Sequence, residues 1–120
     1  MERQIKFRIW GNFQKPPRFM NPAEMPVFFN TWQDFLNKFN DKAWTFQQFT
    51  GLKDKDGREI YEGDILETFV FKIKIIYIIV FENGNFKVKE LGNPNCNLDL
   101  YDIVKNTKII GNIYENPELL

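Results

Sequence analysis

The chain of 120 residues is 43% hydrophobic and 17% aromatic, which predicts one packed domain over residues 1–120 and argues against disorder. Its 16 basic and 16 acidic residues cancel, so the composition gives no general attraction to nucleic acid or to an anionic membrane. The sequence contains neither His nor Ser, which excludes Ser-His triads, Cys-His dyads and His-ligated metal sites. The single cysteine, Cys96, cannot form an internal disulfide or a Cys-rich zinc site.

The N-terminal segment MERQIKFRIW begins with charged residues and lacks the apolar core of a secretion signal. The most apolar run, IIYIIVF at 75–81, is far shorter than the ~20 residues of a membrane-spanning helix. Together with the single cysteine, these features lead us to expect a cytoplasmic protein with no membrane partner.

Residues 5–10 alternate in the period of a half-buried strand, with Lys6, Arg8 and Trp10 on one face. Two basic groups beside an aromatic ring are suited to hold phosphate and to stack a base, so these three residues are candidate contacts for a partner or for nucleic acid. The alternative is a solvated strand face with ordinary lysines. Trp10, a bulky ring on this charged face, either closes a groove or packs under the proline-rich connection at 15–26.

A change of period predicts an amphipathic helix of about ten residues over 31–40. Thr31 lies where an N-cap belongs. So short a helix is not stable alone in water, so its aromatic face must pack on a sheet. That face is formed by residues at i, i+3, i+4 and i+7: Trp32, Phe35, Leu36 and Phe39.

The centre of the chain is rich in strand signals. Residues 43–52 alternate loosely and predict one strand. Residues 59–82 carry apolar side chains at every odd position from 69 to 81, which places them on one strand face. A single strand of that length would be unusual, so we expect a break near 72–74.

Both faces of the strand are apolar at 75–81. One face packs on the core, and the other, formed by Ile76, Ile78 and Val80, needs its own cover. Left bare, it would be an aggregation hazard, so we expect a homo-oligomer with these residues as its contact face. The alternative is that segment 15–48 folds across the face within one chain.

The Asn-Gly pair at 83–84, between two alternating runs, predicts a β-hairpin. Residues 98–104 are typical of a short helix or turn, and 108–115 of a last strand. Asn116 is suited to cap a final helical turn, in which Pro117 takes the first position.

The segment TGLKDKDGREIYEGDIL, at 50–66, resembles a calcium loop only superficially. With Gly57 at the sixth position of an EF-hand loop, Leu52 falls at the first and Gly63 at the twelfth, where oxygen ligands are required. We therefore expect no metal and no cofactor, and interpret the segment as a β-turn in which Gly57 supplies a positive φ.

Catalysis by carboxylates alone is the remaining enzymatic possibility, and we do not expect it. Asp54, Asp56 and Glu59 lie in a polar stretch that should be solvated, where carboxylates keep ordinary pKa values. Asp54 or Asp56 instead hydrogen-bonds the local backbone of the turn. Glu62 and Asp64 share a strand face by spacing, but nothing in the sequence marks a pocket there.

Three segments, MERQIKFRIW, TGLKDKDGREIYEGDIL and IIGNIYENPELL, resemble in content and order the YopX-like family of phage and prophage proteins. The resemblance implies a small protein encoded by a bacteriophage or prophage and acting in the bacterial cytoplasm. The family has no established activity, so the resemblance implies no catalytic residues. It implies a shared scaffold of turn and core residues: Arg8, Trp10, Gly51, Leu52, Asp54, Gly57, Ile60, Tyr61, Gly63, Asp64, Gly111, Tyr114, Asn116 and Pro117.

The sequence thus predicts a mainly β fold of the α+β type. We expect a small, strongly bent sheet or partly closed barrel with one packed amphipathic helix. The function we expect is that of an accessory protein without catalytic activity, which acts by protein–protein interaction with an unknown host or phage protein. The alternative is a small β-barrel nucleic-acid-binding protein.

Overall fold

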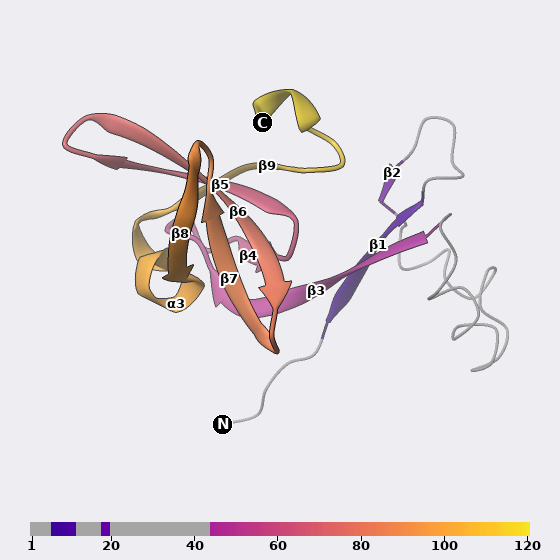
Figure 1. Cartoon of the computed structure of the whole chain (residues 1–120). Helices are drawn as coiled ribbons and strands as arrows, with labels where there is room; N and C mark the ends of the chain where they lie inside the picture. The colour runs from indigo at the N-terminus through magenta and orange to yellow at the C-terminus, as the bar shows by residue number, and fades with distance from the viewer. Residues whose placement is uncertain (1–5, 12–17, 20–43) are drawn as a thin grey trace, which may run out of the picture. The chain divides into compact units, whose positions relative to one another are not determined.

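A computed structural model of the chain describes residues 6–11, 18–19 and 44–120 (Figure 1). The chain divides into two compact units, one formed by Met1–Lys6 with Gln48–Leu120 and the other by Phe7–Gln47. The expected helix over 31–40, with its face of Trp32, Phe35, Leu36 and Phe39, lies outside the described residues. None of the described helices is long and apolar enough to cross a bilayer.

The described strands form two antiparallel sheets. The four-stranded sheet has the order β2-β1-β3-β4 and the five-stranded sheet the order β8-β7-β6-β5-β9. The first sheet contains β1 (Phe7–Gly11), β2 (Arg18–Phe19), β3 (Trp44–Lys53) and β4 (Glu59–Tyr61). The second contains β5 (Asp64–Val70), β6 (Ile73–Glu82), β7 (Asn85–Glu90), β8 (Asn93–Asp99) and β9 (Lys108–Asn112).

The expectation of a mainly β fold is confirmed, but the expected strongly bent sheet or partly closed barrel is wrong. The five-stranded sheet ends at β8 on one side and at β9 on the other, so in the described part of the chain it stays open. Closure requires pairing between the two edge strands. The expected strand at 43–52 is β3, and the expected last strand at 108–115 is β9.

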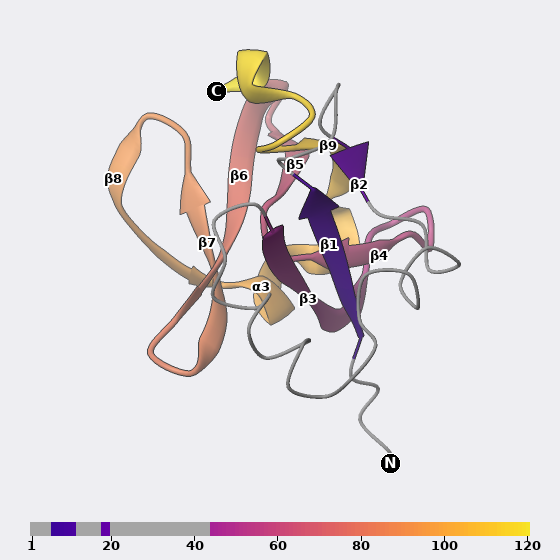
Figure 2. The ribbon, with the colours of Figure 1, turned by 90° about the vertical axis from the view of Figure 1, so that its right-hand side faces the viewer.

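Three short helical segments complete the described elements. The segment predicted as a helix or turn at 98–104 contains α3 (Leu100–Ile103), followed by η2 (Val104–Asn106), and the chain ends in η3 (Pro117–Leu119). The helix α3 contacts β7 and β8 (Figure 2). Buried side chains of β4 to β9, α3 and η2 form one core: Ile60, Leu66, Tyr77, Ile79, Val88, Cys96, Leu100, Val104 and Ile109.

Two-residue turns connect β5 to β6, β6 to β7 and β7 to β8. The hairpin predicted at Asn83-Gly84 is confirmed, because Glu82 pairs with Asn85 directly across it. Both turn residues have positive φ, 52° at Asn83 and 76° at Gly84, as a type I′ hairpin turn requires. The break expected near 72–74 is also present, at residues 71–72.

The C-terminal turn is held by two asparagine side chains. Asn112 Oδ1 accepts hydrogen bonds from the backbone N–H groups of Tyr114 and Glu115, at 3.0 and 2.8 Å. Pro117 takes the first position of η3, as predicted. Asn116 precedes it, but its side chain does not cap η3 and instead accepts a hydrogen bond from Asn112 N at 3.2 Å.

Candidate interaction site

The carboxylate of Asp54 is part of the structural framework rather than a solvated group. The residue is 6% exposed, which corrects the expectation of solvation. Its Oδ1 accepts from the backbone N–H groups of Asp56 and Arg58, each at 2.9 Å, and its Oδ2 from Ile109 N at 3.0 Å. Burial opposes ionisation, but these three donors and the charge of Arg58 outweigh it and lower the pKa of Asp54. The segment is therefore the expected turn, tied in addition to β9.

Three other carboxylates of this segment, those of Glu59, Glu62 and Asp64, also have structural partners. Glu59 pairs with Lys6 at 2.8 Å. Glu62 accepts a hydrogen bond from Gln48 N at 3.0 Å, and Asp64 accepts one from Tyr61 N at 2.8 Å. Across the described ranges, no three His, Cys, Asp or Glu side chains are grouped so that they could hold a metal ion.

Each of the three residues proposed from sequence as contacts, Lys6, Arg8 and Trp10, is engaged within the chain. The hydrogen bond to Glu59 raises the pKa of Lys6. Arg8 Nε donates to Gln47 Oε1 at 2.6 Å. Trp10 is 7% exposed and packs edge-on against Phe19, with ring centroids 4.9 Å apart. Phe19 is a residue of the 15–26 connection, so within the described residues Trp10 packs against one part of that connection.

The face expected to mediate oligomerisation is half-buried within the single chain. Ile76, Ile78 and Val80 have intermediate exposure. Lysines of β7 lie directly across from two of them, Lys89 opposite Ile78 and Lys87 opposite Val80. Aliphatic lysine stems cover neighbouring apolar surface while their ammonium groups stay in water. The chain itself therefore shields part of the apolar β6 face that was expected to require a second subunit.

Four exposed apolar side chains gather instead at the end of the β5–β6 hairpin. Phe69 is 60% exposed, Val70 45%, Phe71 95% and Ile73 66%, and we call these four residues the tip patch. In Figure 1 the β5–β6 turn is the pink loop that extends away from the other strands of its sheet. A cluster of large apolar side chains in water is typical of an interaction surface.

The turn that carries the tip patch has an unfavourable backbone conformation. Phe71 and Lys72 have φ values of 50° and 69°, in the left-handed region that favours glycine and asparagine. The hairpin at Asn83-Gly84 has nearly the same φ values with the residues that suit them. The β5–β6 turn thus keeps an exposed phenylalanine at a position where a better turn residue would be more stable.

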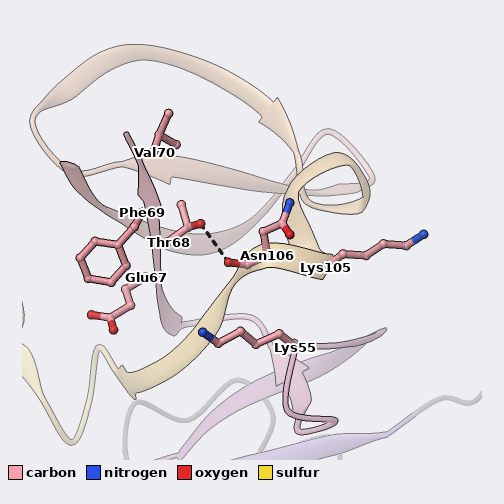
Figure 3. A pocket seen from close by; sticks show the side chains of 7 residues that line it. All are labelled: Lys55, Glu67, Thr68, Phe69, Val70, Lys105 and Asn106. Carbon is pink, nitrogen blue, oxygen red and sulfur yellow. Dashed lines mark hydrogen bonds between the residues drawn. The ribbon is translucent and has the colours of Figure 1, made fainter. Parts of the chain in front are cut away.

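A pocket of about 390 Å³ lies beside this hairpin. Thr68 Oγ1 donates to Asn106 O at 2.9 Å, which joins β5 to η2 (Figure 3). Figure 3 shows Lys55 reaching toward β5, whereas the ammonium of Lys105 points away from Phe69. The lining residues are Lys55, Glu67, Thr68, Phe69, Val70, Lys105 and Asn106.

Comparison with protein families gives a match to the model described as YopX protein over residues 21–120. This range covers most of the chain. The chain belongs to the YopX family. The resemblance seen in the sequence is confirmed, although the segment MERQIKFRIW lies outside the matched range.

A similar fold is found in a solved structure. The chain is similar to the crystal structure of protein EF1440 from Enterococcus faecalis, with a TM-score of 0.59 and 23% identity over 99% of both chains. Comparison with curated proteins gives no match.

Sequence reasoning missed the tip patch of this YopX protein for a specific reason. The odd spacing of Phe69, Phe71 and Ile73 continues that of Tyr77 and Ile79, so the pattern predicts a shared strand face and gives no sign that these three side chains are exposed. The expected break near 72–74 was the one sequence feature that indicated their exposure. Side chains next to a hairpin turn lie at the end of the sheet, where few neighbouring residues can bury them.

Proposed function

We propose that this YopX protein is a phage- or prophage-encoded accessory protein that acts in the bacterial cytoplasm by protein–protein interaction, without catalysis. The observation that carries the proposal is the tip patch on its strained turn. Phe71 is 95% exposed, so the folded chain gains little from its ring. A partner that covers the ring would gain the hydrophobic free energy that folding leaves unused.

The hydrogen bonds of the buried polar groups support a non-catalytic role. The buried carboxylates of Asp54 and Asp64 accept hydrogen bonds from backbone N–H groups, as described above. No buried polar side-chain atom lacks a hydrogen-bond partner in the described part of the chain. Catalytic groups are instead typically held poised for a substrate with a perturbed pKa in a cleft.

Single-stranded nucleic acid is the second candidate partner, because exposed aromatic rings beside lysines can stack bases and hold phosphates. Phe69 and Phe71 lie close in sequence to Lys72 and Lys74. Two observations favour protein. Lys74 is already paired with Glu67 at 3.4 Å, and half of the tip patch is the aliphatic pair Val70 and Ile73, which do not stack on bases.

The test is affinity capture from bacterial cells, with and without phage infection, using the wild-type chain and the double variant Phe71→Asn, Lys72→Gly. The variant installs the residues of the well-formed Asn83-Gly84 turn and removes the exposed ring. We expect proteins that are captured by the wild type and lost with the variant. Identical sets of captured proteins would contradict the proposal, and capture of nucleic acid alone would support the second candidate.

A further inference from the structure

We propose that the edge of β5 beside the pocket binds an extended, acidic peptide segment of a partner protein as an added β-strand. The inference rests on the proposed function and deepens it, since it names the kind of segment that the partner presents. Three features of the described residues carry it: an unpaired strand edge, an excess of lysines, and alternating apolar side chains.

The unpaired edge arises because β9 covers only part of β5. The pairing of the two strands ends where Glu67 lies opposite Lys108. On its other side, β5 stays paired with β6 to the turn, with Val70 opposite Ile73. Residues 68–70 therefore have no partner strand on the β9 side among the described residues. A free edge of this kind is a template for an incoming strand.

The chain itself makes room at this edge. The residues before β9 form η2, Val104–Asn106, and so leave the line of the sheet. The hydrogen bond from Thr68 to Asn106 O holds η2 at the side of β5. The result is the pocket of Figure 3, which lies where the sheet would otherwise continue. A peptide strand placed there extends the ladder of β9 toward the turn.

The charges around the pocket select an acidic segment. Lys55 and Lys105 line it, are exposed, and have no ion-pair partner among the described residues. The only carboxylate in the lining is Glu67, and Lys74 neutralises it at 3.4 Å. Long lysine side chains reorient readily, so the outward direction of Lys105 does not prevent contact with a bound carboxylate.

The apolar side chains set the second requirement of the ligand. Successive residues of a strand point to opposite faces of the sheet, so Phe69 and Val70 offer contacts on the two faces. Both are largely exposed. A segment that alternates acidic and apolar residues would lay an apolar side chain against Phe69, with its carboxylates near the lysines.

The experiment is selection of peptides from a random library displayed on phage, with the intact wild-type chain as bait. We expect enrichment of extended segments with Asp or Glu next to an aliphatic or aromatic residue. Binding of a selected synthetic peptide should weaken about tenfold in the variant Lys55→Glu, Lys105→Glu. The variant Lys87→Glu, Lys89→Glu makes the same change of net charge on β7 and should leave affinity unchanged.

Strand addition itself is tested by N-methylation of the selected peptide. Methyl groups on the backbone nitrogens that face β5 should abolish binding, whereas methyl groups at the alternating, outward-facing positions should have little effect. Equal effects at both sets of positions would overturn strand addition.

Other outcomes separate this inference from the function on which it rests. Selected peptides without acidic enrichment, or unaffected by Lys55→Glu, Lys105→Glu, overturn the acidic ligand. These results do not contradict the proposed function if the double variant Phe71→Asn, Lys72→Gly still fails to capture the proteins that the wild type captures. Binding of a single-stranded oligonucleotide in place of peptides, or of a second copy of the chain at this edge, would also overturn the inference.

Discussion

Asp54 shows how a single side chain can organise two distant parts of the chain. Its Oδ1 accepts hydrogen bonds within its own turn, from Asp56 N and Arg58 N. Its Oδ2 accepts one from Ile109 N, which is 55 positions away. Asp54→Asn replaces one acceptor oxygen by an amide group that faces an N–H donor. We expect the variant to lower the free energy of unfolding by about 1–3 kcal/mol, measured by urea denaturation. The matched control is Asp56→Asn, an exposed neighbour, which should change stability little.

The lowered pKa of Asp54 gives its contribution a defined pH dependence. A carboxyl group whose folded-state pKa lies below its ordinary value of 3.8 stabilises the fold at higher pH. That stability is fully present above 3.8 and is lost as the pH falls through the folded-state pKa. The difference in unfolding free energy between wild type and Asp54→Asn should therefore shrink under strongly acidic conditions. A difference that stays constant from pH 7 to the acid limit of the folded state would contradict this account.

Gly111 is required by close packing rather than by backbone conformation. A Cβ built on it overlaps the Asn116 side chain, whose Oδ1 accepts from Asn112 N. Gly111→Ala should therefore displace that side chain and cost about 1–3 kcal/mol in thermal or chemical unfolding. The double variant Gly111→Ala, Asn116→Ala removes the overlap with the Oδ1 and Cγ atoms of Asn116 and leaves only its Cβ close, at 3.0 Å, so the two losses should be less than additive. Strictly additive losses would show that the two residues do not interact.

The role of a residue was predictable where its contacts are with residues close to it in sequence. The Asp-x-x-Gly pattern of the 54–57 turn predicted that an aspartate would bond nearby backbone, and it does. The third bond of Asp54, to Ile109, was not predictable, because no local pattern says which distant strand passes beside a turn. Asn116 illustrates the same limit: its place before Pro117 was correct, but its side chain prefers the N–H group of Asn112, four residues earlier.

At the scale of elements, two hairpins of the same chain provide a comparison of turn residues. Both turns have two positive-φ positions, filled by Asn83-Gly84 in one and by Phe71-Lys72 in the other. Phe71→Asn, Lys72→Gly should raise the free energy of unfolding by about 1 kcal/mol, because a left-handed conformation is costly for phenylalanine and lysine. Little packing is lost, since Phe71 is 95% exposed. Chemical denaturation measures the change.

The matched change in the other hairpin is Gly84→Ala. No atom lies within 4 Å of a Cβ built on Gly84, so its cost is backbone strain alone. It should lower stability by about 1 kcal/mol. If the Phe71-Lys72 turn were not strained, the double variant would leave stability unchanged or lower it, while Gly84→Ala would still destabilise.

These two turns also show which elements a sequence can predict. The Asn83-Gly84 pair predicts its turn directly, because both residues favour the required positive φ values. The break between β5 and β6 followed only from excessive strand length, since Phe71 and Lys72 carry no turn signal. The exposed apolar surface beside this turn was therefore not predicted.

At the scale of the whole molecule, the mainly β class followed from periodicity, whereas the arrangement of the sheets did not. β9 pairs with β5 across about 40 intervening residues, and β8 pairs with β7 through a two-residue turn. Whether β8 and β9 then meet to close a barrel depends on register and twist, which no short segment encodes. The partly closed barrel was therefore wrong even though most of its strands were correct.

Self-association is the remaining prediction at this scale. Ile76, Ile78 and Val80 keep part of their surface exposed beside the lysines of β7, and a twofold contact would cover it. We expect light scattering at rising micromolar concentration to give a mass that increases above the 14.4 kDa of one chain. Ile78→Lys should abolish the increase, because a charge at the centre of the contact cannot be buried without a partner.

The turn variant Phe71→Asn, Lys72→Gly separates this surface from the tip patch. If self-association uses the β6 face, the variant should associate as the wild type does while losing its captured proteins. If it instead stays at 14.4 kDa whereas Ile78→Lys associates normally, the contact is at the tip patch and the β6 face is only a lysine-covered surface. A wild-type mass of 14.4 kDa at every concentration would reject the oligomer, and the stems of Lys87 and Lys89 would then be sufficient cover for an apolar strand.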